Sequence, residues 1–282
     1  MSTRLRIDLA YDGAGFHGWA RQPALRTVQG DLESALAKVL RLPSVRVACA
    51  GRTDTGVHAR GQVAHIDLPD GVLSTDEDDR GPRVETLGRR LNGVLEDDLR
   101  IRRVSVAPEG FDARFSAVWR RYAYRVADRM DLLDPLRSGH VLTWPRQLDE
   151  DRMNEAAKVL LGKHDFASFC KKRDGATTIR CLLDLRWDRD SDGVLVATVR
   201  ADAFCHNMVR SLIGCMIAVG EGRRPPEWVG EVLHARQREV AAAVVHAHGL
   251  TLEEVGYPEG EELAAQSLRA RALRTLDEEE AS

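Results

Sequence analysis

The order of strand-like and helix-like segments constrains the fold of this chain more than any other feature. Helix-like segments interrupt pairs and runs of strand-like segments along most of the sequence. Strands are predicted at 4–12, 45–50, 61–68, 99–106, 119–127, 180–188, 194–201 and 250–255. Helices are predicted at 28–40, 84–95, 149–161, 203–219 and 229–245. This order predicts an α+β fold with a largely antiparallel sheet, and the comparable content of the two halves allows a pseudo-repeat.

The first predicted helix has a clear start and a clear end. Thr27 is a suitable N-cap, and Pro43 lies just beyond the helical pattern. The apolar residues follow helical spacing: Val28, Leu32, Ala35, Leu36, Val39 and Leu40. These positions are therefore expected to form the buried face of the helix.

The length of 282 residues suits one large domain or two small ones. Pro108 and Gly110 mark a plausible boundary between two halves. We therefore predict an N-terminal half at 1–108 and a C-terminal half at 109–258. Residues 259–282 are predicted to form a flexible acidic tail.

The net charge of −3 hides an uneven distribution of charged residues. Residues 67–79 carry a net charge of −6, and residues 253–282 carry another −6. The rest of the chain therefore carries +9. On charge alone, two interpretations stay open: a basic body that binds a polyanion, or surface charges that cluster by chance.

The cysteine and histidine patterns give no sign of a disulfide framework or a metal site. The five cysteines are odd in number and show no C-x-x-C spacing, and the nine histidines show no ligand spacing. Reduced thiols are therefore expected, as in a cytoplasmic protein. The sequence also lacks an apolar run of ~18 residues and a signal-peptide pattern, so no membrane association is expected.

Residues 50–59 (AGRTDTGVHA) hold the densest group of chemically active side chains. Glycines on both sides allow a tight turn and close approach to a ligand. Asp54 is either a turn former or a catalytic carboxylate, and Arg52 is either its ion-pair partner or a phosphate contact. His58 is either a general base or a buried structural histidine. The residues alone leave these alternatives open.

Two other interpretations of short motifs carry less weight. The Asp54-Thr55-Gly56 triplet matches an aspartic-protease signature, but that reaction needs a second such triplet, which this sequence lacks. The Gly13-Ala14-Gly15 stretch is a weak phosphate-loop signal, because the later glycine and the Lys-Ser/Thr pair are missing.

Five segments, in order, resemble the TruA family of tRNA pseudouridine synthases. They are residues 11–22 (YDGAGFHGWARQ), 50–59 (AGRTDTGVHA), 111–116 (FDARFS) followed by 120–122 (RRY), 162–169 (GKHDFASF) and 206–210 (HNMVR). Together they span nearly the whole chain. The acidic loop around residues 76–80 and the acidic tail at 259–282 depart from the family pattern without touching these segments.

The resemblance implies a pseudouridine synthase fold, with two similar α+β halves around a central, mostly antiparallel sheet. It also implies isomerisation of uridine to pseudouridine in the anticodon arm of tRNA, at positions 38, 39 and 40, after the base leaves its stack. It implies that Asp54 is the nucleophile, that Tyr122 stacks on the base and helps to move a proton, and that Arg210 pairs with Asp54. The residues implied to bind substrate are Tyr122, Arg52, His58 and Arg114.

The family's other properties complete these expectations. The resemblance implies a homodimer that needs no cofactor and no metal. The alternative function is a non-catalytic RNA-binding protein on the same fold, with Asp54 in a structural role. A carboxylate beside RNA phosphate repels it, which favours catalysis over binding alone.

Overall fold

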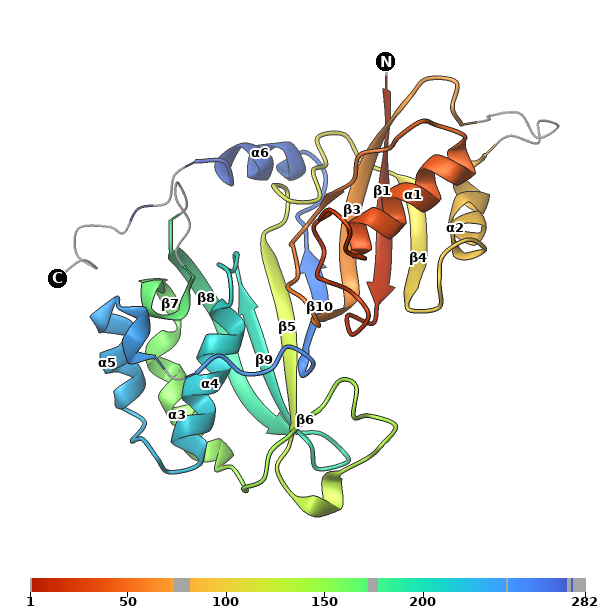
Figure 1. The fold of residues 1–282 in the computed structure, drawn as a ribbon. Helices are drawn as coiled ribbons and strands as arrows, with labels where there is room; N and C mark the ends of the chain where they lie inside the picture. Colours follow the sequence, from red (N-terminus) through yellow and green to blue (C-terminus); the bar gives the residue numbers. More distant parts are fainter. Residues whose placement is uncertain (1, 74–81, 172–176, 242, 273–274, 276–282) are drawn as a thin grey trace. The chain divides into compact units, whose positions relative to one another are not determined.

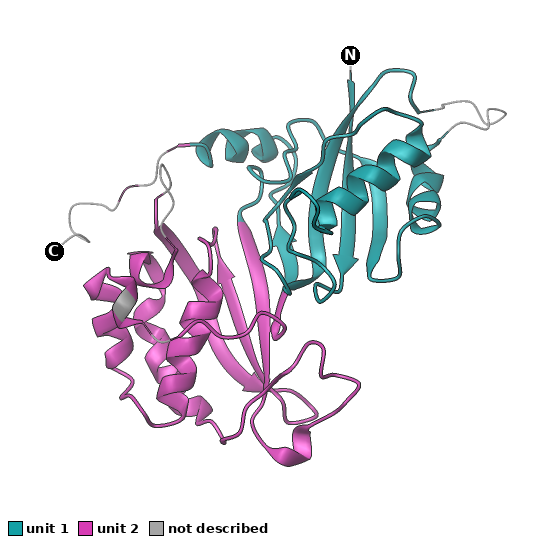
Figure 2. Cartoon of the chain, in the orientation of Figure 1, with its two compact units in different colours: residues 1–118, 252–271 teal, residues 119–251, 272–282 magenta. Residues whose placement is uncertain are grey.

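The structure, a computed structural model, describes residues 2–73, 82–171, 177–241, 243–272 and 275. It divides into two compact units, shown in Figure 2. Unit 1 combines Met1–Val118 with Leu252–Arg271, and unit 2 combines Trp119–Thr251 with Ala272–Ser282. The observed boundary lies later than the predicted one at residue 108. The chain also returns to unit 1 after residue 251, which a boundary signal in the sequence cannot reveal.

Unit 1 is built on strands in the order β4-β1-β3-β10. β1 pairs antiparallel with both β3 and β4, and the short β2 pairs antiparallel with β3. The strand bounds are β1 Ser2–Tyr11, β2 Ala48–Cys49, β3 His58–Pro69, β4 Leu99–Val106 and β10 Leu250–Gly256. Alternate residues of β1, including Leu5, Ile7 and Leu9, are fully buried, as period-two alternation predicts.

Three helices belong to unit 1: α1 Val28–Leu40, α2 Val84–Asn92 and α6 Glu262–Arg269 (Figure 1). The predicted start of α1 is confirmed, because the Thr27 side chain accepts a hydrogen bond from the Gly30 N–H. The six predicted apolar positions of α1 are all buried. α2 packs on β4, with Gly88 against Ile101 and Val104.

The predicted flexible tail contains the ordered helix α6. Leu263 is only 3% exposed, and its carbonyl accepts a hydrogen bond from the Ser116 hydroxyl. Gly110 adopts a positive φ of 75° where it meets Ala264. These contacts hold residues 262–269 on unit 1, whereas an acidic composition alone indicated a solvated end. The predictions for most of the acidic loop and for the end of the tail concern residues 74–81 and 276–282. These lie outside the described residues.

Unit 2 is built on strands in the order β5-β9-β8-β7, with antiparallel pairing throughout that series. β6 pairs parallel with β5. The bounds are β5 Trp119–Ala127, β6 Leu142–Thr143, β7 Gly162–Asp165, β8 Ile179–Arg189 and β9 Leu195–Ala201. The strands of both units thus confirm the predicted α+β class with mostly antiparallel pairing.

Helices α3, α4 and α5 pack together in unit 2, and α3 also contacts β8. Their bounds are α3 Glu150–Ala157, α4 Met208–Gly220 and α5 Trp228–Ala235, with 3₁₀ turns at Met130–Leu132, Lys158–Leu160, Ala167–Phe169 and Arg238–Val240. The prediction of helix at 203–207 was wrong, because Asn207 adopts a left-handed φ of 67°. The predicted helix at 229–245 ends early, at Ala235: Arg236 has a φ of 51°, and the backbone of Ala243 runs against Gly214 of α4.

The expectation that all five cysteines are reduced thiols differs from the structure. Cys170 and Cys205 form a disulfide, with Cα atoms 5.7 Å apart. Cys170 follows the 3₁₀ turn Ala167–Phe169, and Cys205 precedes α4. Their pairing depends on how unit 2 packs, so spacing along the sequence does not show it. Cys49, Cys181 and Cys215 form no disulfide.

Candidate active site

The Asp54 loop, residues 50–57, connects β2 to β3 in unit 1. Asp54 is half-buried, Arg52 is exposed and Thr53 is buried between them. The Val57 N–H donates to the Asp54 carbonyl at 3.1 Å, which closes a tight turn. Gly56 adopts a φ of 77°, a conformation that favours glycine. The loop therefore holds Asp54 on an ordered backbone between two strands.

The opening loop, residues 12–19, packs directly on the Asp54 loop. The Trp19 N–H donates to the Thr53 carbonyl at 2.9 Å. Gly18 has a φ of 86°, and a Cβ there would lie 2.9 Å from the Thr53 carbonyl oxygen. A Cβ on Gly13 would collide with the backbone of Val57. These glycines permit close packing of the two loops. Their presence is therefore explained without a phosphate-binding role.

His58 lies beneath the opening loop. The Gly13 N–H donates to its Nδ1 at 3.0 Å, and Asp12 Oδ1 lies 3.0 Å from the same nitrogen. The ring is buried. In this position His58 connects the start of β3 to the opening loop.

Two of the predicted arginines lie near Cys49, at the end of β2. Burial raises the pKa of the Cys49 thiol to about 12, while the charges of Arg52 and Arg114 act in the opposite direction. Both arginines are exposed. Because both guanidinium groups act on one thiol, the structure brings Arg52 and Arg114 to the same region of unit 1, next to the Asp54 loop.

Residues 111–116, which carry Arg114, form a turn that is fixed at several points. Asp112 Oδ1 accepts hydrogen bonds from the N–H groups of Arg114 and Phe115, both at 2.8 Å. The Ala113 N–H donates to His65 Nδ1 at 3.0 Å, and the Tyr257 hydroxyl donates to the Ala113 carbonyl at 2.6 Å. Arg114 is thus presented from a rigid segment.

The remaining two predicted residues belong to unit 2. Tyr122 lies in β5, is 7% exposed, and packs edge-on against Phe204 with ring centroids 5.1 Å apart. Arg210 lies in the first turn of α4, and its Nε donates to the Val245 carbonyl at 2.7 Å. Burial raises the pKa of Tyr124, and the charge of Arg210 opposes that shift. Arg210 therefore lies close to Tyr124, two residues beyond Tyr122 on β5.

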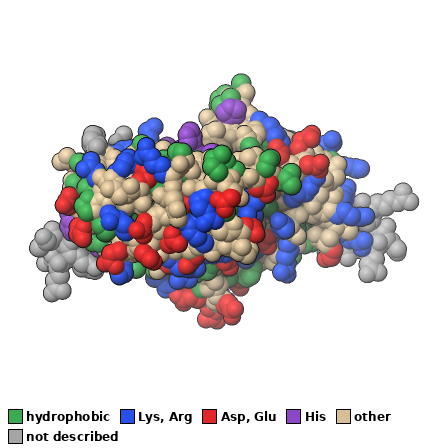
Figure 3. Space-filling view, turned by 90° about the horizontal axis from the view of Figure 1, so that it is seen from below, with side chains coloured by type: hydrophobic (Ala, Val, Ile, Leu, Met, Phe, Trp, Pro, Cys, Tyr) green, Lys and Arg blue, Asp and Glu red, His purple; other side chains and the backbone are tan. Residues whose placement is uncertain are grey.

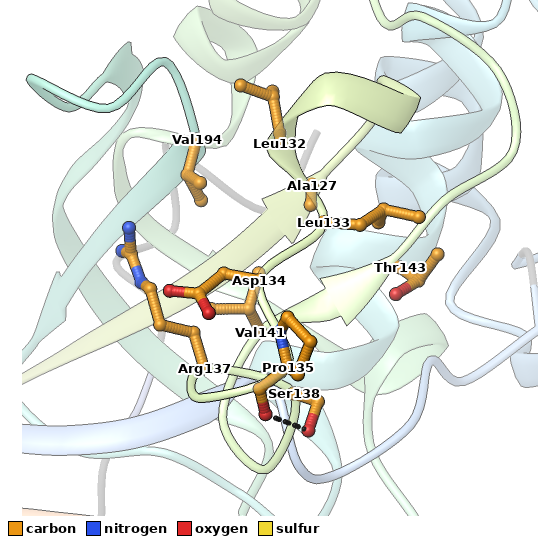
Figure 4. A pocket seen from close by; sticks show the side chains of 10 residues that line it. All are labelled: Ala127, Leu132, Leu133, Asp134, Pro135, Arg137, Ser138, Val141, Thr143 and Val194. Carbon is orange, nitrogen blue, oxygen red and sulfur yellow. Dashed lines mark hydrogen bonds between the residues drawn. The ribbon is translucent and has the colours of Figure 1, made fainter.

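Unit 2 also contains an apolar pocket of about 180 Å³, whose lining side chains are drawn in Figure 4. It lies under the loop between β5 and β6 and contains none of the six predicted site residues. Its lining is Ala127, Leu132, Leu133, Asp134, Pro135, Arg137, Ser138, Val141, Thr143 and Val194. Ala127, Val141 and Val194 form a small buried cluster there, against which Leu132 packs. The pocket lining is mostly structural apolar packing.

Two features of the described residues concern metal ions and membranes. Among them, no group of three or more His, Cys, Asp or Glu side chains is arranged to hold a metal ion. Within the same residues, none of the helices has the length and apolar character needed to cross a membrane.

His65 makes stability dependent on pH. Burial and the charge of Arg4 lower its pKa below the usual value, against the opposing effects of Asp112 and Asp67. The unfolded chain therefore binds this proton more readily, so the free energy of unfolding should fall as pH drops through the unfolded pKa of about 6.5. His65→Asn keeps an acceptor for Ala113 but has no proton to bind.

Urea unfolding at about pH 7.5 and about pH 5.5 tests this expectation. The loss of stability on acidification should be smaller in His65→Asn than in the unsubstituted protein. An equal loss in both proteins would show that His65 contributes nothing to the acid sensitivity.

Comparison with known proteins supports the resemblance seen in the sequence. A sequence profile described as tRNA pseudouridine synthase matches residues 156–258. The chain is 58% identical over 276 residues to the tRNA pseudouridine synthase A of Streptomyces griseus, covering 97% of this chain and 95% of the relative. It is 56% identical to that of Frankia casuarinae, covering 96% of each chain. It is 53% identical to that of Leifsonia xyli, covering 98% of this chain and 99% of the relative.

Solved structures give a weaker match. The match to a chain of an archaeal box H/ACA sRNP Nop10-Cbf5 complex covers 76% of this chain and 44% of that chain. The sequence identity is 12% and the TM-score is 0.32. That score is too low to support a conclusion. The full-length relatives instead agree on one class of enzyme, an isomerase. The chain belongs to the tRNA pseudouridine synthase A family, the TruA family.

Proposed function

We propose that this protein converts uridine to pseudouridine at positions 38, 39 and 40 of tRNA, with Asp54 as the nucleophile and with the target base flipped out of its stack. The observation that carries the proposal is the Asp54 loop: a half-buried carboxylate on a backbone held by its neighbours, with Arg52 and Arg114 in the same region. Family membership supplies the reaction.

The chemistry is a rearrangement within one nucleotide. The Asp54 carboxylate attacks either C1′ of the ribose or the uracil ring, and the bond between C1′ and N1 breaks. The detached uracil turns over and forms a bond from C5 to C1′, while the carboxylate leaves. The proton on C5 is then removed and N1 gains one, so no atom is gained or lost overall.

The other predicted residues have proposed roles that agree with their surroundings. We propose that Tyr122 contacts the target base and helps to move the C5 proton. We propose that Arg210 pairs with Asp54; its bond to Val245 fixes the guanidinium. Arg52 and Arg114 would bind the phosphates around the displaced nucleotide. His58 would contribute to substrate binding, with its ring held against the opening loop.

The proposal also covers the assembly and its surroundings. We propose a homodimer in the cytoplasm that uses neither a cofactor nor a metal ion. An incubation with unmodified tRNA in the presence of a strong chelator tests whether the reaction needs a metal ion. Activity that persists in the chelator supports it, and activity that is lost and returns with added divalent metal contradicts it.

The direct test uses purified protein and transcribed tRNAs that carry uridine at one of the three positions. Pseudouridine should appear at each position, and it should not appear at uridines elsewhere in the same tRNA. Tight tRNA binding without any pseudouridine would favour the alternative, a non-catalytic RNA-binding protein.

Binding of tRNA should weaken with salt through particular arginines. Basic and acidic side chains alternate over the face shown in Figure 3, so this face is not uniformly basic. Each phosphate contact contributes a slope of about −0.7 to −0.9 to the plot of log affinity against log salt. Arg114→Gln should therefore weaken binding and reduce the slope by about one such unit. Arg186→Gln, at an exposed arginine paired with Asp184 and Asp188, is the control and should leave the slope unchanged.

The end of the chain should contribute little to tRNA binding. Because α6 packs on unit 1, a truncation that tests the acidic end must lie beyond it, after Ala272. Carboxylates near bound RNA oppose it within a Debye length of about 8–10 Å, so we expect the acidic end to point away from the RNA. Truncation should change the Kd for tRNA by less than about threefold at physiological salt. A gain of about tenfold or more would show that the acidic end competes with RNA for basic residues.

A further inference from the structure

A buried set of hydrogen bonds lies beneath the Asp54 loop. The Tyr11 hydroxyl, at the end of β1, lies 2.8 Å from Thr53 Oγ1. Gln62 Nε2, in β3, donates to the Tyr11 oxygen at 3.2 Å and to the Gly51 carbonyl at 2.8 Å. Gln62 is 0% exposed, and Tyr11 and Thr53 are also buried. We call these three side chains the Gln62–Tyr11–Thr53 network.

The network reaches the loop on both sides of Arg52. Gln62 holds the carbonyl of Gly51, while Tyr11 holds the side chain of Thr53. The backbone of Thr53 is also held, because its carbonyl accepts from the Trp19 N–H. Thr53 is therefore fixed through both its side chain and its main chain, directly before Asp54.

The members of the network are themselves firmly placed. The Tyr11 ring packs against Phe16 and Trp19, with centroid distances of 6.3 and 6.2 Å. The Val63 N–H donates to Gln62 Oε1 at 3.3 Å, so both ends of the Gln62 amide are used. Both Gln62 and Tyr11 lie on strands that pair with each other. The paired strands of the sheet therefore determine where the Asp54 loop is anchored.

An apolar core would not need these polar groups at such depth. Burial of an amide or a hydroxyl costs free energy unless its hydrogen bonds are made, and it specifies one geometry when they are. The position next to Asp54 gives that geometry a use, because misplacing a reacting group by about 1 Å can cost about 100-fold in rate.

We infer that Gln62, Tyr11 and Thr53 are positioning residues, which set the place of the Asp54 carboxylate for catalysis. This inference rests on the proposed role of Asp54. The network does not touch the substrate; it acts through the backbone of the loop. Its loss should therefore lower kcat while leaving KM for tRNA nearly unchanged.

The first test compares two substitutions at one position. Thr53→Val keeps the shape of the side chain but removes the hydroxyl, and Thr53→Ser keeps the hydroxyl. Thr53→Val should lower kcat about tenfold or more, and Thr53→Ser should remain within about threefold of the unsubstituted protein. KM should stay within about twofold in both. Thr251→Val, at another buried threonine, is the control and should leave kcat within about twofold.

The second test asks whether the side chains act together. Tyr11→Phe keeps the ring and removes only the oxygen shared with Thr53 and Gln62. It should lower kcat as Thr53→Val does, and the double variant should fall within about threefold of the single ones. Gln62→Met is a third variant, which removes the amide donor at the other end of the Gln62–Tyr11–Thr53 network. All assays are run below the Tm of the least stable variant, so loss of folding does not enter kcat.

Three results would overturn the inference: an unchanged kcat in Tyr11→Phe, independent effects that multiply in the double variant, or a rise in KM that matches the fall in kcat. The same measurements on Asp54→Asn separate this inference from the proposed function. An inactive Asp54→Asn with a fully active Tyr11→Phe removes only the positioning role. An active Asp54→Asn removes the proposed nucleophile.

Discussion

Replacing Asp54 with asparagine is expected to lower turnover below about 1% of that of the unsubstituted protein, while tRNA binding stays nearly intact. The amide has almost the same shape as the carboxylate, so the turn that Val57 closes on the Asp54 carbonyl should persist. An amide oxygen is, however, a far weaker nucleophile. The substitution also removes a negative charge beside RNA phosphate, so affinity should rise slightly.

Release of tritium from tRNA labelled at C5 of uridine measures this turnover directly. Asp131→Asn makes the same change at a carboxylate that is 70% exposed in unit 2, and it should leave the rate unchanged. Asp54→Glu retains the charge but moves it along a longer side chain, and it should also be severely impaired. Turnover by Asp54→Asn above about 1% would exclude Asp54 as the nucleophile.

Local patterns in the sequence predicted much of the secondary structure. The strands at Leu99–Val106 and Trp119–Ala127 coincide with the predicted ranges, and α1 begins at the residue after its predicted cap. In these segments the period of the apolar residues and the cap are local signals, and the tertiary structure agrees with them. Such agreement is expected where one face of an element is buried in the core.

The wrong predictions share a different origin. The predicted helix at 229–245 ends at Ala235, and Ala243 lies against Gly214, where only a glycine leaves room for the backbone of Ala243. Residues 262–269 lie in the predicted acidic tail, yet Leu263 is buried against unit 1. The pairing of Cys170 with Cys205 likewise depends on packing. Each outcome is decided by contacts between residues that are distant in the sequence, and such contacts override local preference.

The candidate site was only partly predictable for the same reason. The composition of residues 50–59 singled out Asp54 and Arg52, because glycines and polar side chains gather there. The anchors of that loop were missed, since Gln62 and Tyr11 are 51 residues apart and each is ordinary within its own strand. The proposed roles of Tyr122 and Arg210 came from the family resemblance alone. Without it, one is typical of a buried strand aromatic and the other of a residue in a helix.

Replacing Tyr122 with phenylalanine separates two proposed roles for that side chain. Phenylalanine keeps the aromatic face and the edge-on contact with Phe204, so folding and tRNA affinity should be preserved. It removes only the hydroxyl oxygen. Transfer of a proton by a positioned side chain contributes about 100-fold or more to a rate, so we expect kcat to fall about 100-fold with KM unchanged.

Two further variants decide what an observed loss means. Tyr124→Phe removes another hydroxyl from β5, one that donates to the His246 carbonyl, and it should lower the Tm more than it lowers kcat. Tyr122→Leu removes the aromatic face as well, and should add a loss of stacking worth about 1–3 kcal/mol for a base. If Tyr122→Phe turns over almost normally while Tyr122→Leu does not, the hydroxyl moves no proton. Tyr122 then serves as a flat surface for the flipped base, and the group that removes the C5 proton must be sought elsewhere in the site.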